Sequence, residues 1–185
     1  GKTLTIFDLD NTLIKGDSST LWSRFMVREG WVTDPNYLAR EALLMDDYDR
    51  GEMNIADYVA LIQAPLIGVP KAEVDALVAR CVQQDIMPRV YPQAWDLIHT
   101  LQAKGEQILV ISASVSLLVQ AVSDELGIDQ ALGIDVEMAD DFALLDHQRD
   151  RAQHLDAAIS RRKDEVLDIR AFADRAIAMV EFFEE

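Results

Sequence analysis

Two short apolar runs, each followed by polar residues, constrain the fold of this chain more than any other feature. The first run, Thr3–Phe7, is followed by Asp8 and Asp10, and the second, Gln107–Ile111, is followed by Ser112. Runs of this length that are rich in β-branched and large apolar residues predict buried strands. Both strands would therefore carry polar side chains at their carboxyl ends.

The rest of the second half of the chain alternates predicted helices and strands. We expect strands near 132–137 and 168–173, and helices near 115–126, near 151–162 and from about residue 175. Strands that alternate with helices form a parallel sheet with helices on both of its faces. The predicted fold class is therefore α/β, with a Rossmann-like parallel-sheet core.

The long segment between the first two strands has the apolar spacing of helices, interrupted at intervals by Gly and Pro. We expect residues 16–90 to form a helical insertion, and residues 1–15 and 91–185 to form the α/β core. The side chains expected to pack inside the insertion are Trp22, Phe25, Met26, Leu44, Tyr58, Leu61 and Val78.

The charge of the chain limits its partners. Asp and Glu number 33 against 17 Lys and Arg, which gives a formal net charge of −16. Such an acidic surface repels phosphate backbones, so we expect no nucleic-acid partner. An anionic substrate would need a positive group between itself and the protein, and Mg²⁺ held by carboxylates could supply it.

Cysteine content and hydropathy predict the compartment. Cys81 is the only cysteine, which excludes an internal disulfide and a cysteine-based zinc site. The apolar run at the start of the sequence is too short for a signal peptide, and no run is long enough to span a membrane. We therefore expect a soluble cytoplasmic protein with no membrane partner, while the oligomeric state stays open.

Ligands of open parallel sheets bind beyond the carboxyl ends of the strands. Asp8 and Asp10 could place one carboxylate and one backbone carbonyl on a single cation and leave the second carboxylate to exchange protons. Ser112 would lie where a helix begins and could bind a phosphate, and Asp174 could supply a further metal ligand. These groups together are typical of phosphoryl transfer through an aspartyl-phosphate.

These residues also carry a resemblance to a known family. The segment Asp8–Leu13 resembles the first motif of the haloacid dehalogenase-like phosphatase superfamily, and Val110–Ser114 is similar to the second. The helical insertion resembles the cap domain of the phosphoserine phosphatase-like branch, and the segment Leu13–Ser18 resembles that branch closely. The resemblance implies a magnesium-dependent phosphatase, a phosphomonoester hydrolase that acts on a small phosphorylated metabolite.

The resemblance implies a role for each candidate residue in the reaction. Asp8 would be the nucleophile and a metal ligand. Asp10 would protonate the leaving alcohol, then activate water, and would offer its backbone carbonyl to Mg²⁺. Asp174 would complete the metal site.

Four further residues would bind the substrate if the resemblance holds. Ser112 and Ala113 would bind the phosphoryl oxygens, and Arg151 would neutralise their charge, with Lys163 a weaker candidate for that role. Asp17 stands where phosphoserine phosphatases carry a Glu that recognises the substrate amine. The shorter side chain argues against phosphoserine and leaves a cationic or hydroxylated substrate open.

The fourth motif departs from the family pattern. Asp174 keeps the first acid of this motif, but Ala178 stands where the family has a second acid. Either the site is altered in this protein or residues are missing from this part of the sequence, and we expect the second. Two alternatives to a hydrolase remain: a phosphotransferase, and a catalytically weakened phosphate-binding or regulatory protein.

Overall fold

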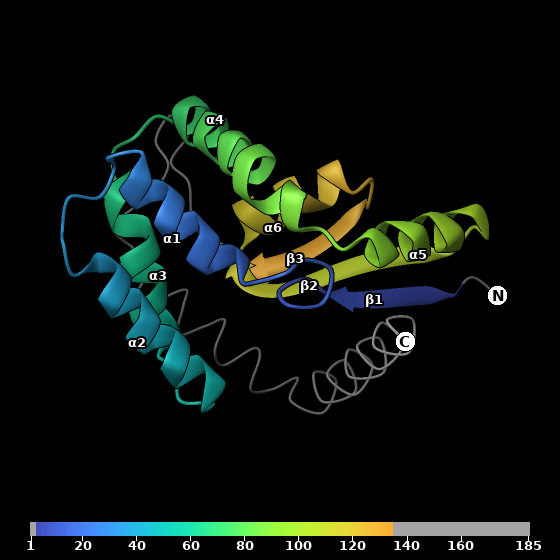
Figure 1. The fold of residues 1–185 in the computed structure, drawn as a ribbon, viewed down its shortest axis with the longest axis horizontal. Coiled ribbons are helices and arrows are strands. Elements are labelled where there is room, and N and C mark those ends of the chain that lie inside the picture. The colour runs from blue at the N-terminus through green and yellow to red at the C-terminus, as the bar shows by residue number, and fades with distance from the viewer. Residues whose placement is uncertain (1–2, 135–185) are drawn as a thin grey trace.

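A three-stranded parallel sheet forms the centre of the computed structural model, which describes residues 3–134 (Figure 1). The strands are β1 (Leu4–Asp8), β2 (Gln107–Val115) and β3 (Gln130–Ile134), in the order β1-β2-β3. The parallel α/β core predicted from the sequence is confirmed. The predicted elements beyond residue 134, together with Arg151, Lys163 and Asp174, lie outside the described residues.

The register of the sheet brings the carboxyl ends of β1 and β2 together. Asp8 lies beside Ile111, so the residues that follow β1 are adjacent to Ser112 on β2. Phe7 and Val110 are register partners and are both fully buried. The polar ends of the two strands are therefore held side by side by buried apolar pairing behind them.

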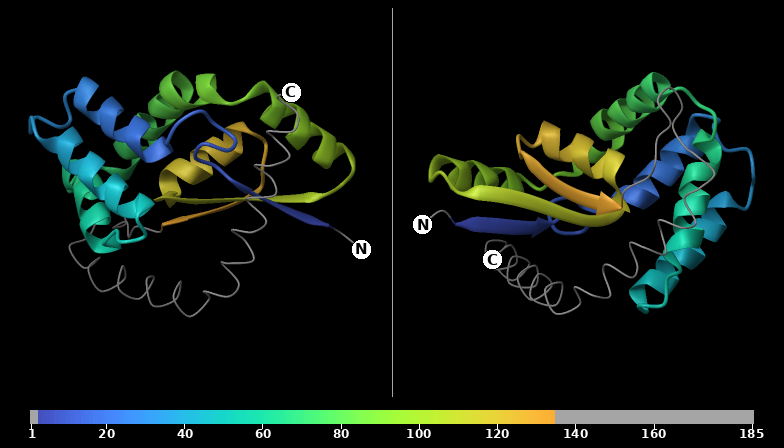
Figure 2. Two further views of the ribbon diagram at one scale, coloured as in Figure 1. Left: turned by 60° about the horizontal axis from the view of Figure 1, so that its bottom comes forward. Right: turned by 180° about the vertical axis from the view of Figure 1, so that it is seen from behind.

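Two helices lie over one face of this sheet, namely α5 (Pro92–Ala103) and α6 (Ser116–Glu125) (Figure 2). Pro92 begins α5, a position where its missing N–H costs no helical hydrogen bond. Beyond the end of α6, Gly127 has a φ of 71°, the left-handed conformation that commonly terminates helices. The helix predicted near residues 115–126 is thus confirmed to within a residue at each end.

The segment between β1 and β2 is helical, as predicted. It contains α1 (Ser18–Arg28), α2 (Tyr37–Asp49), α3 (Ile55–Gln63) and α4 (Lys71–Cys81). It also contains the short 3₁₀-helices η1 (Ala64–Leu66) and η3 (Met87–Arg89) and the short π-helix η2 (Val82–Ile86). The side chains of Asp17 and Asn54 cap α1 and α3 by accepting hydrogen bonds from backbone N–H groups in the first turn.

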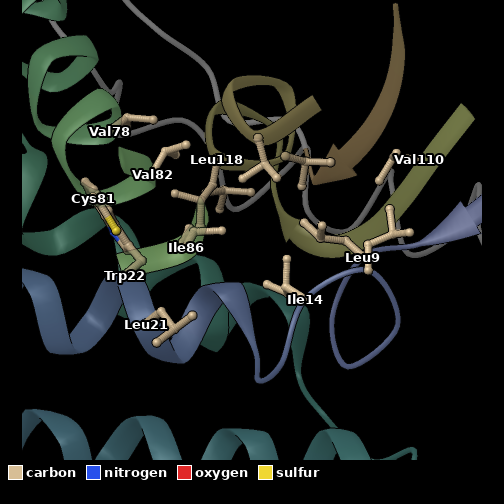
Figure 3. Packing of buried hydrophobic residues seen from close by; sticks show 14 of the residues in the cluster. Leu9, Ile14, Leu21, Trp22, Val78, Cys81, Val82, Ile86, Val110 and Leu118 are labelled. Carbon is tan, nitrogen blue, oxygen red and sulfur yellow. The ribbon is translucent and has the colours of Figure 1, made fainter. Parts of the chain in front are cut away.

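The apolar side chains expected inside the insertion are buried, except that Leu44 is only partly covered: Trp22, Phe25, Met26, Tyr58, Leu61 and Val78. The same cluster continues into the sheet layer, because α4 and η2 pack against α6. Figure 3 shows Ile86 of η2 close to Leu118 of α6 within this cluster. The helical insertion therefore rests on the core, and its separation into a distinct cap domain at residues 16 and 90 stays a prediction.

The chain enters and leaves the insertion through two hydrogen-bonded segments. The Lys15 N–H donates to the Arg89 carbonyl at 2.8 Å, and the Tyr91 N–H donates to the Leu13 carbonyl at 3.0 Å. Gly16 has a φ of 104°, a conformation that favours glycine. This pairing fixes where α1 begins relative to the end of β1.

An irregularity in the sheet accompanies the second polar strand end. Ile111 pairs with Leu132 and Val115 pairs with Ile134, so Ser112–Ser114 face the single residue Gly133. Extra residues of this kind bend a strand and redirect its side chains, and they occur often beside active sites. This irregularity accompanies the extension of β2 to Val115, four residues beyond the predicted run Gln107–Ile111.

Gly133→Ala tests this close approach of β2 and β3. A Cβ atom at residue 133 would lie 2.7 Å from the Ser114 carbonyl oxygen and 2.9 Å from the Ser116 nitrogen, both backbone atoms. We expect the substitution to lower the free energy of unfolding by about 2 kcal/mol or more, measured by urea denaturation.

Gly68→Ala is the control for this substitution. Residue 68 has no atom within 4 Å of the added Cβ and has a φ of 76°. Gly68→Ala therefore tests left-handed backbone strain alone, which we expect to lower the free energy of unfolding by about 1 kcal/mol. A Gly133→Ala protein as stable as wild type would contradict the described packing.

Candidate active site

The loop that follows β1 is fixed by its own backbone. Leu9, Leu13 and Ile14 have no exposed side-chain surface, and the N–H groups of Leu13 and Ile14 both donate to the Leu9 carbonyl, at 3.0 and 3.3 Å. Asn11 has a φ of 56°, which asparagine tolerates better than most residues. Its N–H donates to the Gly16 carbonyl at 3.0 Å, and its side chain accepts from the Gly16 N–H at 3.1 Å. Asp10 is thereby held in a closed loop.

The Asp10 carboxylate joins three parts of the chain. The Ser112 hydroxyl on β2 donates to Oδ2 of Asp10 at 2.6 Å. The backbone N–H and the hydroxyl of Ser18, the first residue of α1, both donate to Oδ1 at 2.6 Å. Two of the residues singled out in the sequence, Asp10 and Ser112, are thus in direct contact.

Asp8 lies beside this group at the end of β1. The Thr12 hydroxyl donates to Asp8 Oδ2 at 3.2 Å. Burial, and then the negative charge of Asp10, raise the pKa of Asp8 to about 6. A bound cation would act in the opposite direction by stabilising the ionised carboxylate.

Asp17 caps α1 and belongs to the same acidic region. Its Oδ1 accepts from the Thr20 N–H at 3.0 Å. Burial, followed by the charge of Asp10, raises its pKa to about 7. The capping contact accounts for its position at the start of α1, and a role in substrate recognition stays a prediction.

Glu41 adds a further carboxylate that sequence reasoning missed. It is only 3% exposed, and its Oε1 accepts from the Thr20 hydroxyl at 2.9 Å. Burial raises its pKa as well. No sequence signal marks it, because α2 reaches this region only through the tertiary packing of α1 against α2.

Two further serines belong to this group: Ser18, which sequence reasoning missed, and Ser114, which ends the predicted Val110–Ser114 motif. The hydroxyls of Ser18 and Ser114 lie 2.6 Å apart, and the Ser114 N–H donates to the Ser112 hydroxyl at 3.0 Å. A signal existed for Ser114, since residues two apart on a strand lie on the same side. Ala113 lies between these two serines and is half-buried.

The described residues include two of the three predicted magnesium ligands. The Asp8 carboxylate and the Asp10 backbone carbonyl are oxygen ligands of the kind that Mg²⁺ prefers. Within residues 3–134, no group of three or more His, Cys, Asp or Glu side chains could hold a metal ion on its own. The donors present fit such an ion, and the third predicted ligand, Asp174, lies outside the described residues.

Comparison with known proteins identifies the family. The family model for haloacid dehalogenase-like hydrolase matches residues 5–178. The chain belongs to this family. This confirms the family predicted from the Asp8–Leu13 and Val110–Ser114 motifs.

Individual relatives agree with this assignment. The chain is 30% identical over 140 residues to a histidinol-phosphatase of Neisseria meningitidis serogroup C (strain 8013), a match that covers 76% of this chain and 63% of the relative. The crystal structure of a protein of unknown function from Bordetella pertussis Tohama I is 26% identical with a TM-score of 0.67, and the match covers 77% of this chain and 65% of that one.

A phosphoserine phosphohydrolase-like protein from Francisella tularensis subsp. tularensis SCHU S4 shares the fold. Its TM-score is 0.58 at 19% identity, over 79% of this chain and 64% of that one. The chain spans less than two thirds of the length of the curated relatives that it matches. No helix within the described residues has the length and apolar character needed to cross a membrane.

Asp17→Asn tests the electrostatics of the acidic region. Asparagine caps helices as well as aspartate does, so the substitution removes the charge and keeps the cap. Because the pKa of Asp17 in the folded protein, about 7, exceeds its ordinary value of 3.8, ionised Asp17 costs stability above pH 7, and this cost disappears below about pH 4. We expect Asp17→Asn to melt above wild type at pH 8 and at the wild-type temperature at pH 4.

Asp96→Asn, which removes an exposed carboxylate on α5, is the control for this comparison. Its melting temperature should follow that of wild type across the same pH range. An Asp17→Asn difference that grew as the pH fell would have the wrong sign for this explanation.

Proposed function

We propose that this chain is a magnesium-dependent phosphomonoester hydrolase that acts on a small phosphorylated metabolite through an aspartyl-phosphate on Asp8. The observation that carries the proposal is the contact between the Asp10 carboxylate and the Ser112 hydroxyl beside Asp8. Membership of the haloacid dehalogenase-like hydrolase family supports it. We place the activity in the cytoplasm, as expected from the sequence.

Asp8 would attack the phosphorus atom of the substrate. The Thr12 hydroxyl orients its carboxylate by binding Oδ2. Asp8 must be ionised to attack, and its raised pKa of about 6 still leaves it mostly ionised at neutral pH. Mg²⁺, held by Asp8, the Asp10 carbonyl and Asp174, would neutralise the charges of the carboxylates and the phosphate.

Ser112 and Ala113 would bind the phosphoryl oxygens, and Arg151 would neutralise their charge. Ser112 has the means to do so, because its hydroxyl is a donor that already faces the site. Asp10 would give a proton to the leaving alcohol and later take one from the attacking water. Asp10 is suited to this exchange because hydrogen bonds fix both of its carboxylate oxygens.

A substrate with a positive charge fits the acidic region best. Asp17 and Glu41 lie near the site, and neither forms an ion pair with a Lys or Arg among the described residues. We therefore propose an amino-alcohol phosphate. Histidinol phosphate is the first to test, because a relative is a histidinol-phosphatase.

A phosphotransferase would differ only in the acceptor that attacks the aspartyl-phosphate, so an alcohol acceptor added to the assay would detect it. A weakened phosphate-binding protein is favoured by Ala178 in the fourth motif. That alternative predicts phosphate binding without turnover of any ester.

Asp8→Asn should abolish hydrolysis, because no neighbouring group can form the same acyl-phosphate. The assay is Mg²⁺-dependent release of 4-nitrophenol from 4-nitrophenyl phosphate, with circular dichroism to show that the protein is folded. The control is Asp57→Asn, which removes a carboxylate from the first turn of α3 and should leave turnover unchanged. Turnover at the wild-type rate by Asp8→Asn would end the aspartyl-phosphate proposal.

Asp10→Asn should separate proton transfer from metal binding. The proposed metal contact of Asp10 is its backbone carbonyl, so Mg²⁺ affinity measured by calorimetry should largely persist. The turnover number should fall by about 10²-fold or more, the usual scale for acid–base assistance. Lost Mg²⁺ affinity with intact turnover would reverse the roles assigned to the two parts of this residue.

A further inference from the structure

We propose that Ser18 is a positioning residue that anchors Oδ1 of Asp10, so that Asp10 exchanges protons with substrate and water through Oδ2. This inference rests on the proposed function and assigns its proton transfer to one atom. Neither the sequence motifs nor the family resemblance singled out Ser18. The two oxygens of the Asp10 carboxylate have different hydrogen-bond donors.

Oδ1 is occupied by two donors from one residue. The Ser18 N–H and the Ser18 hydroxyl each lie 2.6 Å from Oδ1. A backbone N–H can only donate, so a proton on Oδ1 would have to face a second proton across a short contact. Oδ1 is therefore the oxygen that stays unprotonated.

Oδ2 has a different neighbour. Its partner is the Ser112 hydroxyl at 2.6 Å, and that hydroxyl also accepts from the Ser114 N–H at 3.0 Å. A hydroxyl can rotate and act as donor or acceptor, so it can face either a bare or a protonated Oδ2. The Ser112 hydroxyl can also turn its proton towards a bound phosphoryl group, which frees Oδ2 for the reaction.

Ser114 holds the anchor in place. Its hydroxyl lies 2.6 Å from that of Ser18. Because Ser18 gives its own proton to Asp10, the proton between the two serines comes from Ser114. Ser18 is fully buried and Ser114 is 2% exposed, so water does not compete for these contacts.

The anchor also links the insertion to the chemistry. Ser18 is the first residue of α1, so the direction of the Asp10 carboxylate depends on the position of that helix. A shift of a catalytic group by about 1 Å can cost about 10²-fold in rate. Loss of the Ser18 hydroxyl should therefore misplace the Asp10 carboxylate and slow proton transfer.

The proton balance assigns both steps to Oδ2. In the first step an oxygen of the Asp8 carboxylate forms a bond to phosphorus as the ester P–O bond breaks, and the leaving oxygen keeps the electron pair of that bond and takes the proton from Oδ2 as the Oδ2–H bond breaks. In the second step water gives a proton to Oδ2 while its oxygen attacks phosphorus, and the Asp8 carboxylate leaves with the electron pair of its P–O bond. Asp10 ends protonated, as it began.

Ser18→Ala tests the inference, because it removes one donor to Oδ1 and keeps the N–H. The two substrates are phenyl phosphate and 4-nitrophenyl phosphate, which are similar in shape but differ in how much their leaving group needs a proton. We expect kcat/KM for phenyl phosphate to fall by about tenfold more than kcat/KM for 4-nitrophenyl phosphate. A purely structural role would lower both values equally.

The control is Ser123→Ala, which removes a buried hydroxyl on α6 that has no hydrogen-bond partner among the described residues. Ser123→Ala should leave kcat/KM unchanged for both phenyl phosphate and 4-nitrophenyl phosphate. If Ser18→Ala does not fold, as judged by its thermal unfolding, Ser114→Ala takes its place, since it removes the donor to Ser18. For Ser114→Ala we again expect kcat/KM to fall more for phenyl phosphate than for 4-nitrophenyl phosphate, by a smaller factor than in Ser18→Ala.

The outcomes separate this inference from the proposed function. Wild-type protein that hydrolyses neither ester with Mg²⁺ would overturn the proposed function and this inference with it. Normal wild-type hydrolysis, with an equal loss on both esters or no loss in the serine variants, would overturn the inference alone.

Discussion

The hydrogen bonds that surround the Asp10 carboxylate are the interaction on which the rest of the site depends. A partly buried carboxylate without partners is costly, and each donor offsets part of that cost. The donors come from Ser112 on β2 and from Ser18 at the start of α1, while the carboxylate itself follows β1. Satisfying one charged group therefore fixes two strands and a helix relative to each other.

Behind this polar contact, apolar packing holds the same three parts of the chain in place. Leu9 and Ile14 on the loop after β1 are fully buried, and Trp22 and Phe25 on α1 stack with ring centroids 5.8 Å apart. These residues belong to one cluster with the buried residues of the sheet. The site is thus the polar end of a continuous apolar core, and the core supplies the rigidity that short hydrogen bonds require.

The remaining electrostatics favour a positive partner. Burial raises the pKa values of Asp8, Asp17 and Glu41, and the negative charge of Asp10 adds to this effect at the first two. Within residues 3–134, none of these carboxylates pairs with a Lys or Arg side chain. A divalent cation beside Asp8 and a cationic group near Asp17 would relieve this repulsion, and both belong to the proposed function.

The sequence by itself determined the parallel α/β core, the helical insertion and the placement of Asp10 and Ser112 at one edge of the sheet. Local signals were sufficient there, because apolar runs mark buried strands and the carboxyl ends of parallel strands lie at one edge of a sheet. Only the tertiary structure decided which serines hold Asp10 and which acid lies near Asp17. Ser18, Ser114 and Glu41 acquire their roles from the irregular register of β2 and from the packing of α1 against α2. Such contacts join residues far apart in the chain, and no local pattern encodes the distance between them.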